Sequence, residues 1–156
     1  MFKIGVISDT HNFLDAGIHD LFEGVEHILH AGDIGLPKII SELETIATVT
    51  SVSGNTDDPG FNYPETEVVT LGGRKILLHH IVNPRNLSQQ VQSLIASEQP
   101  DIVIFGHTHQ PFSATLHGVL FFNPGYAGKS RFGMERSVAL LKLDEKGIRS
   151  EYLKLS

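Results

Sequence analysis

The side chains that could do chemistry in this chain follow its apolar segments, at the point where each segment ends. Five such segments end in an aspartate, an asparagine or a histidine. In chain order these residues are Asp9, His11, Asp33, Asn55, His80, His107 and His109. Imidazole nitrogens bind transition metals, and carboxylate and amide oxygens bind harder ions. The set therefore predicts a site for divalent metal ions.

The spacing of these residues also suits a shared site. Asp9 and His11 are two residues apart, and so are His107 and His109. Because side chains alternate faces along a strand, residues two apart at a strand end are able to point to one place. Each motif alone has an ordinary explanation as a turn or a helix cap, but the five together favour a metal site. Three glycines directly precede candidate ligands and would let the backbone approach closely: Gly32, Gly54 and Gly106.

The apolar segments predict the strands and helices that would position these residues. Strands are expected at residues 2–8, 26–30, 47–55, on both sides of a turn at 72–73 within 65–80, at 101–105, and over most of 112–155. Helical spacing of apolar residues predicts helices over 14–22, from Pro37 to about Ile46, and over 87–95. Strand and helix alternate at first and the last third is mainly strand, which predicts an α/β layered sandwich in a single domain, residues 1–156.

The composition excludes several classes of function. The net charge is −6, from 12 basic and 18 acidic residues, which argues against a stable nucleic-acid partner because phosphate backbones need clustered lysine and arginine. There is no cysteine, so disulfides and thiolate ligands are absent. The first residues lack the layout of a signal peptide, and no apolar stretch approaches the ~18 residues of a membrane span. We expect a cytoplasmic protein without a membrane partner.

As a set, the strand-end motifs resemble those of the calcineurin-like metallophosphoesterases. The "NPG" sequence at residues 123–125 is similar to that of the small single-domain bacterial and archaeal phosphodiesterases of this superfamily. The resemblance covers residues 1 to about 143. It implies a layered α/β/β/α sandwich of two mixed β-sheets flanked by helices.

The resemblance also implies two divalent metal ions and their ligands. One ion would be held by Asp9, His11 and His109. The other would be held by Asn55, His80 and His107, and Asp33 would bridge the two. The family has Thr-His where this chain has His79-His80, so His80 is the expected ligand, with His79 as the alternative if the register slips by one residue. Mn²⁺, Fe, Ni²⁺ and Zn²⁺ all fit ligands of this kind, and the resemblance favours Mn²⁺.

The implied activity is hydrolysis of a small phosphodiester by attack of a metal-bridging hydroxide on phosphorus. Two divalent ions, two carboxylates and the hydroxide give a formal charge of about +1, which matches a diester monoanion better than a monoester dianion. Many members of the wider superfamily have a histidine directly after the ligand asparagine, where it protonates the leaving group. Thr56 follows Asn55 here. Because threonine is a poor acid at neutral pH, we expect a steep dependence of the rate on the leaving-group pKa.

Contacts with substrate are predicted for Asn12, Asn55 and Arg85. A helix cap is the alternative for Asn12, and a solvated loop position is the alternative for Arg85, whose guanidinium could bind phosphate through two hydrogen bonds. Lys129 and Arg131 are weaker candidates of the same kind. Among the remaining histidines, His30 is either an orienting residue or a core residue; the others, expected to be structural or at the surface, are His19, His27 and His117.

Three classes of function compete, and the two-metal phosphodiesterase is favoured. A phosphomonoesterase or protein phosphatase is disfavoured by the short chain and the missing proton donor. A non-catalytic protein-binding scaffold, as in a retromer subunit of the same fold, is disfavoured because every ligand position holds a competent side chain. The family suggests a homodimer. The loops expected to determine the substrate are at about 57–65, 81–88 and 126–135.

Overall fold

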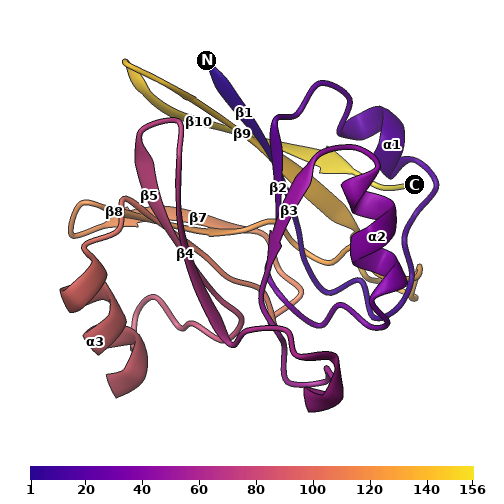
Figure 1. Ribbon diagram of the computed structural model, residues 1–156, viewed down its shortest axis with the longest axis horizontal. Coiled ribbons are helices and arrows are strands. Elements are labelled where there is room, and N and C mark those ends of the chain that lie inside the picture. Colours follow the sequence, from indigo (N-terminus) through magenta and orange to yellow (C-terminus); the bar gives the residue numbers. More distant parts are fainter.

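Ten strands form two five-stranded sheets that pack face to face, with helices on their outer sides (Figure 1). The computed structural model describes residues 1–156. Helices α1 and α2 lie on one side of the molecule and α3 lies on the other. This is the layered α/β/β/α sandwich that was predicted, with two mixed sheets between the helical layers.

The first sheet has the strand order β10-β9-β1-β2-β3. Its strands are β1 (Phe2–Ile7), β2 (His27–His30), β3 (Thr48–Ser51), β9 (Ser137–Asp144) and β10 (Gly147–Lys154). Strands β1, β2 and β3 are parallel, while β9 is antiparallel to β1 and to β10. The carboxyl ends of β1, β2 and β3 therefore meet at one edge, where open α/β sheets build their sites.

The second sheet has the order β4-β5-β6-β8-β7. Its strands are β4 (Thr66–Leu71), β5 (Arg74–His79), β6 (Ile102–Ile104), β7 (Phe112–Leu116) and β8 (Val119–Asn123). Strands β5, β6 and β8 are parallel, and the edge strands β4 and β7 are antiparallel to their neighbours. The predicted hairpin turn at Gly72 and Gly73 joins β4 to β5, and both glycines have positive φ angles, as a tight hairpin turn requires.

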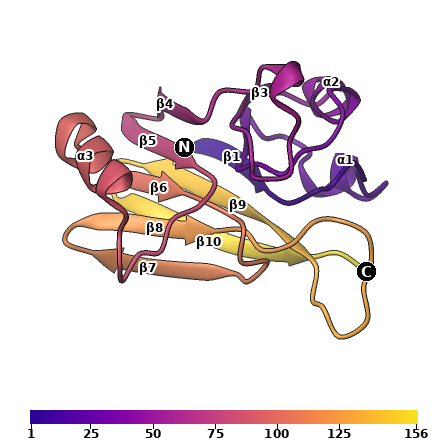
Figure 2. The same ribbon diagram turned by 90° about the horizontal axis from the view of Figure 1, so that it is seen from below.

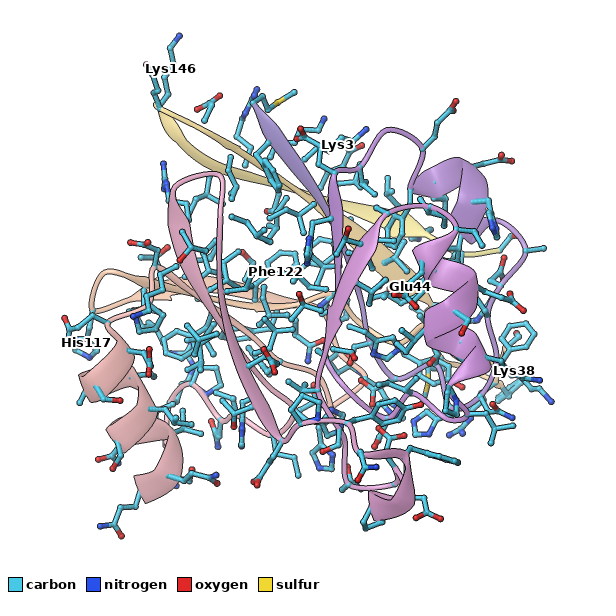
Figure 3. The ribbon with its side chains drawn as sticks, viewed as in Figure 1. Lys3, Lys38, Glu44, His117, Phe122 and Lys146 are labelled. Carbon is cyan, nitrogen blue, oxygen red and sulfur yellow. The ribbon has the colours of Figure 1, made fainter.

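The core between the sheets follows from alternation along the strands. Ile4 and Val6 of β1 and Ile76 and Leu78 of β5 point inward and are fully buried. Phe122 of β8 lies in the middle of this layer (Figure 3). Each such side chain contributes about 1.5–3 kcal/mol when it is buried. This core fixes the two sheets relative to each other, and with them the strand ends.

The helices cover the opposite faces of the sheets. Helices α1 (Ile18–Leu21) and α2 (Lys38–Glu44) pack their apolar side chains on the outer face of the first sheet. Helix α3 (Gln89–Glu98) packs on the second sheet, and the Ser88 side chain caps it by accepting a hydrogen bond from the Val91 N–H. Figure 2 shows α3 separated from α1 and α2 by both sheets. None of the three has the length and apolar character needed to span a bilayer.

Several elements are shorter than predicted. Helix α1 begins only at Ile18, because the Asp15 carboxylate accepts a hydrogen bond from the Gly17 N–H and also pairs with the buried Arg136. Pro37 is the N-cap of α2, so this helix begins at Lys38, one residue later than predicted. Strand β3 ends at Ser51, so the residues up to Asn55 form a loop. This loop contains part of the candidate site.

Candidate metal centre

All seven predicted ligands meet at the carboxyl ends of five parallel strands. The first sheet supplies residues after β1, β2 and β3, and the second sheet supplies residues after β5 and β6. Those from the first sheet are Asp9, His11, Asp33 and Asn55, and those from the second are His80, His107 and His109. The site therefore lies where the ends of the two sheets face each other.

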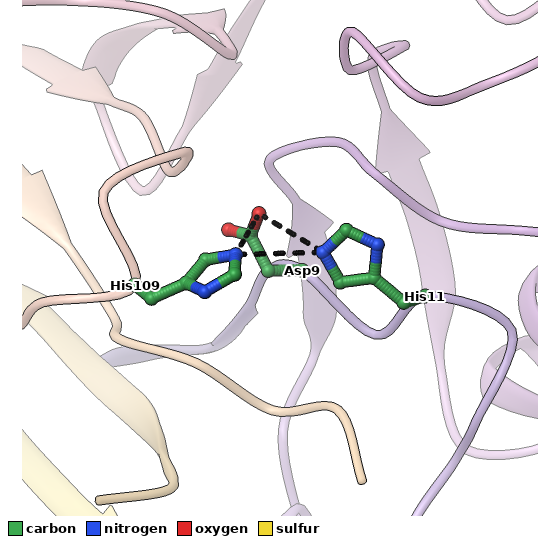
Figure 4. Close-up of side chains that lie close together, drawn as sticks. All are labelled: Asp9, His11 and His109. Atoms are coloured by element: carbon green, nitrogen blue, oxygen red, sulfur yellow. Dashed lines mark hydrogen bonds and ion pairs between the residues drawn. The ribbon is translucent and has the colours of Figure 1, made fainter. Parts of the chain in front are cut away.

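The first group of side chains consists of Asp9, His11 and His109 (Figure 4). Asp9 Oδ1 lies 3.3 Å from His109 Nε2 and 3.7 Å from His11 Nε2. The two ring nitrogens are 3.4 Å apart. One oxygen and two imidazole nitrogens thus converge on one point, which is the donor set of a transition-metal site.

The second group consists of Asp9, Asp33 and His80. His80 Nε2 lies 3.3 Å from Asp33 Oδ2 and 3.9 Å from Asp9 Oδ1. Asp33 Oδ2 is also 3.7 Å from His11 Nε2, so this carboxylate faces both groups. Its other oxygen accepts a hydrogen bond from the Thr56 N–H, which holds Oδ2 toward the cluster.

Asn55 extends the second group on its exposed side. Asn55 Oδ1 is 3.1 Å from His80 Nε2 and 3.0 Å from His107 Nδ1. His80 Nδ1 lies 2.7 Å from the Ala31 carbonyl oxygen. Because a carbonyl only accepts, Nδ1 carries a proton, and in the neutral ring His80 Nε2 faces the cluster with its lone pair.

The register of the β4–β5 hairpin decides between the two adjacent histidines. His79 is paired with Thr66 across the hairpin, and its Nδ1 lies 2.9 Å from the Thr66 hydroxyl. Alternation along the strand turns the next side chain the other way. His80, and not His79, therefore lies in the cluster, as the sequence favoured.

The surroundings of the buried Asp9 carboxylate indicate whether the cluster fits a cation. Asp9 is fully buried, and its Oδ2 accepts hydrogen bonds from the Ser8 hydroxyl and the His107 N–H. Its Oδ1, the oxygen that faces the two imidazoles, has no hydrogen-bond partner. An unpaired buried carboxylate oxygen is costly unless a cation compensates it. The oxygen and nitrogen donors around it fit a divalent metal ion.

Burial and neighbouring charges shift the pKa values in opposite directions across the cluster. Burial raises the pKa of Asp9, although the Ser8 hydrogen bond and nearby imidazoles oppose it. Burial also acts on Asp33, but hydrogen bonds from His80 and Thr56 outweigh it and hold the pKa of Asp33 well below its usual range. Burial opposes protonation of His80, yet the two carboxylates raise its pKa above the ordinary value. A metal ion would replace this proton, because binding requires neutral imidazole.

The backbone at the site is strained. Nine residues other than glycine have positive φ angles, and six of them lie in the loops after β1, β2 and β6. They are Asp9 (57°), His11 (46°), Asn12 (65°), Asp33 (56°), His107 (72°) and His109 (62°). Aspartate, asparagine and histidine adopt this left-handed region more readily than other residues. Such strain gathers at functional sites, where the surrounding structure enforces it.

The glycines before the candidate ligands allow the loops to touch. A Cβ atom on Gly54 would overlap the Asp33 carboxylate, and one on Gly106 would overlap the Ser8 hydroxyl and the Asp9 carboxylate. Any larger residue at these two positions would therefore push the loops apart. This close approach is the one predicted from the sequence.

Asp57 is a supporting residue that the sequence did not reveal. Its carboxylate accepts hydrogen bonds from the backbone N–H groups of Ile34, Gly35 and Gly54, at 2.8–3.1 Å. It thereby ties the loop after β2 to the loop after β3 and fixes Asp33 relative to Asn55. Hydrogen bonds to a charged acceptor are the stronger kind.

Asn123 supports the opposite side of the site in a similar way. This fully buried residue ends β8 and opens the "NPG" sequence. Its amide nitrogen donates to the Gly106 carbonyl and the Thr108 hydroxyl, and its oxygen accepts from the Gly125 N–H. The motif therefore holds the loop that carries His107 and His109.

Two of the predicted substrate contacts have other partners. Asn12 Oδ1 accepts a hydrogen bond from the Leu36 N–H, so it secures the loop before α2 and does not cap α1. Arg85 is exposed, and its guanidinium carbon lies 6.0 Å from the centroid of the Phe112 ring. Neither its guanidinium nor its backbone makes a hydrogen bond or ion pair with the cluster.

Arg131 lies on the other side of the site. Its guanidinium carbon is 5.3 Å from the centroid of the Tyr126 ring, which in turn lies 4.7 Å from the His109 ring. Lys129 accepts a hydrogen bond from the Tyr126 hydroxyl through its backbone carbonyl. The positively charged Arg131 guanidinium thus lies near the His109 side of the cluster.

His30 is a core residue that orders the backbone near the cluster. Its Nδ1 accepts from the Gly32 N–H, which leaves the proton on Nε2, 3.0 Å from the Thr10 hydroxyl. Complete burial lowers the pKa of His30 to about 3, so the ring is neutral. His19 and His27 are bonded to threonines, and His117 lies at the β7–β8 turn at the far edge of the molecule (Figure 3).

A cleft of about 770 Å³ opens beside the cluster, with Asn55 and His80 at its inner end. One wall is the loop after β3, which includes the short 3-10 helix η1 (Pro59–Phe61), and the other wall contains residues of the segment 79–90. We call it the polar cleft. Two of the three loops predicted to determine the substrate contribute to its lining, and the loop at 126–135 does not.

Comparisons with known proteins agree on one superfamily. The model of the calcineurin-like phosphoesterase superfamily domain matches residues 2–146. A probable metallophosphoesterase from Methanothermobacter thermautotrophicus is 37% identical over 97% of this chain and 91% of its own length.

Solved structures share the fold over nearly the whole chain. An archaeal phosphodiesterase, described as structurally and functionally characterised, is 26% identical with a TM-score of 0.74, covering 97% of this chain and all of its own. Vps29 from Entamoeba histolytica, solved in complex with Zn²⁺, has a TM-score of 0.76 at 24% identity, covering 98% of this chain and 99% of its own. At that identity the likeness to Vps29 shows the fold alone.

Proposed function

This chain belongs to the calcineurin-like phosphoesterase superfamily, and on that premise we propose that it is a metal-dependent phosphodiesterase acting on a small phosphodiester. One observation carries the proposal: two groups of potential metal ligands share the buried carboxylate of Asp9, whose Oδ1 has no other partner. A structure without a metal-binding role would have little reason to keep that oxygen unpaired.

The proposed centre holds two divalent ions, with Mn²⁺ as the favoured metal. Asp9, His11 and His109 would hold one ion. Asn55, His80 and His107 would hold the other, and Asp33 would be a ligand to both. The distances of Asp33 Oδ2 to His80 Nε2 and His11 Nε2, 3.3 Å and 3.7 Å, support the bridging position.

When bound, two such ions supply a water of lowered pKa as the nucleophile and compensate the charge of the phosphate. The chain's own residues position the ligands. The Ser8 hydroxyl and the His107 N–H hold Asp9 Oδ2, so that Oδ1 points to the cluster. The Ala31 carbonyl fixes the ring orientation of His80.

The residues near the cluster support a diester with a good leaving group. Asp9 and Asp33 are the two carboxylates of the cluster, and this small number suits a monoanionic diester. Thr56 donates its backbone N–H to Asp33 and offers no acid beside Asn55 that could protonate a leaving group at neutral pH. In this proposal the substrate is a small phosphodiester, and the protein has neither a stable nucleic-acid partner nor a membrane partner. The chain forms a homodimer.

The test is hydrolysis of bis(p-nitrophenyl) phosphate and p-nitrophenyl phosphate by protein stripped with a chelator. Adding Mn²⁺ should restore cleavage of the diester, at a rate well above that of the monoester. In a series of aryl diesters, the rate should fall steeply as the pKa of the leaving phenol rises. Faster cleavage of the monoester would indicate a phosphomonoesterase. Tight binding of metal without any hydrolysis, with Mn²⁺, Ni²⁺ or Zn²⁺, would indicate a scaffold.

A further inference from the structure

We infer that the polar cleft binds the alcohol part of the substrate, and that this alcohol is uncharged and rich in hydroxyl groups, as in a sugar or polyol. The inference rests on the proposed function, because it places the phosphate at the metal cluster and one ester group in the cleft. It adds the substrate class, which neither the fold nor the metal ligands define.

The position and size of the polar cleft suit such a group. The cleft starts at Asn55 and His80, both in the candidate metal centre, and extends away from them for a volume of about 770 Å³. Pockets for small molecules usually have volumes of about 300–1,000 Å³. An alcohol attached to a phosphate at the cluster therefore has room for a unit as large as a sugar.

The charge of the lining disfavours an anionic alcohol. Fourteen residues line the cleft, and none of them is lysine or arginine. Three are carboxylates: Asp57, which accepts backbone hydrogen bonds, and the exposed Asp58 and Glu65. A second phosphate or a carboxylate on the ligand would meet like charge here. The guanidinium of Arg131 lies beyond His109, outside the cleft.

The hydrogen-bonding groups of the lining favour hydroxyls over an apolar group. His79 lines the cleft, and its Nδ1 is hydrogen-bonded to the Thr66 hydroxyl, which leaves its Nε2 available to a ligand. Gln90 donates to one oxygen of Glu65, which leaves the other oxygen as an acceptor. Only two of the fourteen lining residues are hydrophobic.

A cationic alcohol is the less favoured occupant. Recognition of quaternary ammonium groups relies on several aromatic faces around the cation. Tyr63 is the one aromatic residue other than histidine in the lining, and its hydroxyl is bonded to the Gly35 carbonyl. The cleft therefore has acceptors for hydroxyl groups but no aromatic cage.

The experiment compares four phosphate monoesters as ligands of the Mn²⁺-loaded protein. Sorbitol 6-phosphate and 6-phosphogluconate differ only in having CH₂OH or a carboxylate at the far end. Phenyl phosphate carries an apolar alcohol and phosphocholine a cationic one. Calorimetry gives each Kd, and inhibition of bis(p-nitrophenyl) phosphate hydrolysis gives each Ki. Sorbitol 6-phosphate should bind about tenfold more tightly than each of the other three, because the carboxylates repel the anion of 6-phosphogluconate, and neither phenyl phosphate nor phosphocholine offers hydroxyl groups to the acceptors of the cleft.

Reversing one charge in the lining tests whether the cleft causes the difference in affinity between these ligands. Glu65→Lys should remove most of the difference between sorbitol 6-phosphate and 6-phosphogluconate. The matched control is Glu44→Lys on α2, away from the cleft (Figure 3), which should leave the difference intact. Equal binding of this pair, tighter binding of phenyl phosphate or phosphocholine, or a preference that Glu65→Lys does not change would each overturn the inference.

The two readouts separate this inference from the proposed function. If the protein hydrolyses bis(p-nitrophenyl) phosphate but shows no preference among the four ligands, the assignment of the cleft fails and the enzymatic proposal holds. If it hydrolyses no diester but shows the preference by calorimetry, the enzymatic proposal fails and the cleft still binds hydroxylated groups.

Discussion

The two sheets contribute different chemistry to the candidate metal centre. The first sheet supplies every oxygen donor, from Asp9, Asp33 and Asn55, together with the imidazole of His11, whereas the second sheet supplies three imidazoles and no carboxylate. The carboxylates are buried, but His107 of the second sheet is exposed. Neither sheet holds enough donors for either proposed ion, so the centre can form only once the sheets have packed together.

The two sides are also held in place by different means. The loops of the first sheet are tied to each other by the Asp57 carboxylate and its backbone partners. The loop after β6 in the second sheet is held by Asn123 at the end of β8. Each side is therefore ordered before metal binds, and the ions would join two preformed halves.

The largest expected effect comes from removing the contribution of the second sheet. His107→Ala and His109→Ala should each reduce metal-dependent diester hydrolysis by more than about hundredfold, since loss of even a supporting partner costs 10–100-fold. Each variant should lose one bound ion, as measured by metal analysis, while its circular dichroism stays unchanged. His19→Ala, an exposed histidine on α1, is the control. Full activity in either ligand variant would show that its assignment is wrong.

A smaller loss is expected when the loops of the first sheet are released from each other. Asp57→Asn keeps the size of the side chain but removes the charge and one acceptor for the three backbone N–H groups. We expect unfolding in urea to reveal a loss of about 1–3 kcal/mol, and metal affinity to fall by about tenfold. Asp20→Asn on the exposed face of α1 should change neither, and unchanged metal affinity in Asp57→Asn would mean that the two loops are positioned independently.

His30, which lies in the first sheet, should make the free energy of unfolding depend on pH. Its pKa is lowered to about 3 in the folded protein, so the unfolded chain binds a proton near pH 6.5 that the folded chain does not. The stability from this neutral ring is complete above pH 6.5 and is lost as the pH falls toward 3, by at most about 1.4 kcal/mol per pH unit. His30→Leu should flatten the measured profile between pH 6.5 and 4; an unchanged slope would contradict this.

The smallest effect is expected at Arg85, the predicted phosphate contact that does not reach the cluster. Its guanidinium lies over Phe112 at the surface, and an exposed contact of this kind is worth at most about 1 kcal/mol. Arg85→Ala should change kcat/KM for the diester by less than about twofold, measured beside Arg131→Ala, which removes the cation near His109. A large loss of kcat/KM in Arg85→Ala would show that Arg85 contacts the substrate after all.

The sequence predicted which residues meet but not how they are held. Strand ends and their polar residues are local features, so the positions of Asp9, Asp33 and His107 followed from apolar runs and glycines. The choice of His80 over His79 rested on the resemblance to the family's Thr-His motif, and the pairing of His79 with Thr66 agrees with it. Asp57 could not be recognised, because its partners are backbone groups and two of the three, in Ile34 and Gly35, belong to a loop more than twenty residues earlier. Every residue except proline has the same backbone N–H group, so the residue types in the sequence do not show which N–H groups a carboxylate will bind.

Segments that depend on tertiary contacts were predicted less well. Apolar spacing indicated a helix over residues 14–22, yet the ion pair of Asp15 with Arg136 joins positions far apart in the chain and holds the first residues of this segment in a loop. The sequence predicted three loops around the substrate, of which two line the polar cleft. Its lining depends on how the segment after β3 faces the segment after β5, which no local pattern specifies.

The left-handed backbone conformation of the ligand residues lowers the stability of the protein, although the proposed activity requires these residues. Five of the seven candidate ligands have positive φ angles, and such a conformation costs a residue with a Cβ atom about 1 kcal/mol that glycine would avoid. Replacing any of them by glycine would therefore relieve strain while deleting a metal ligand. Selection for a more stable chain would favour glycine at these positions, and the residues now present are the ones that selection for activity must retain.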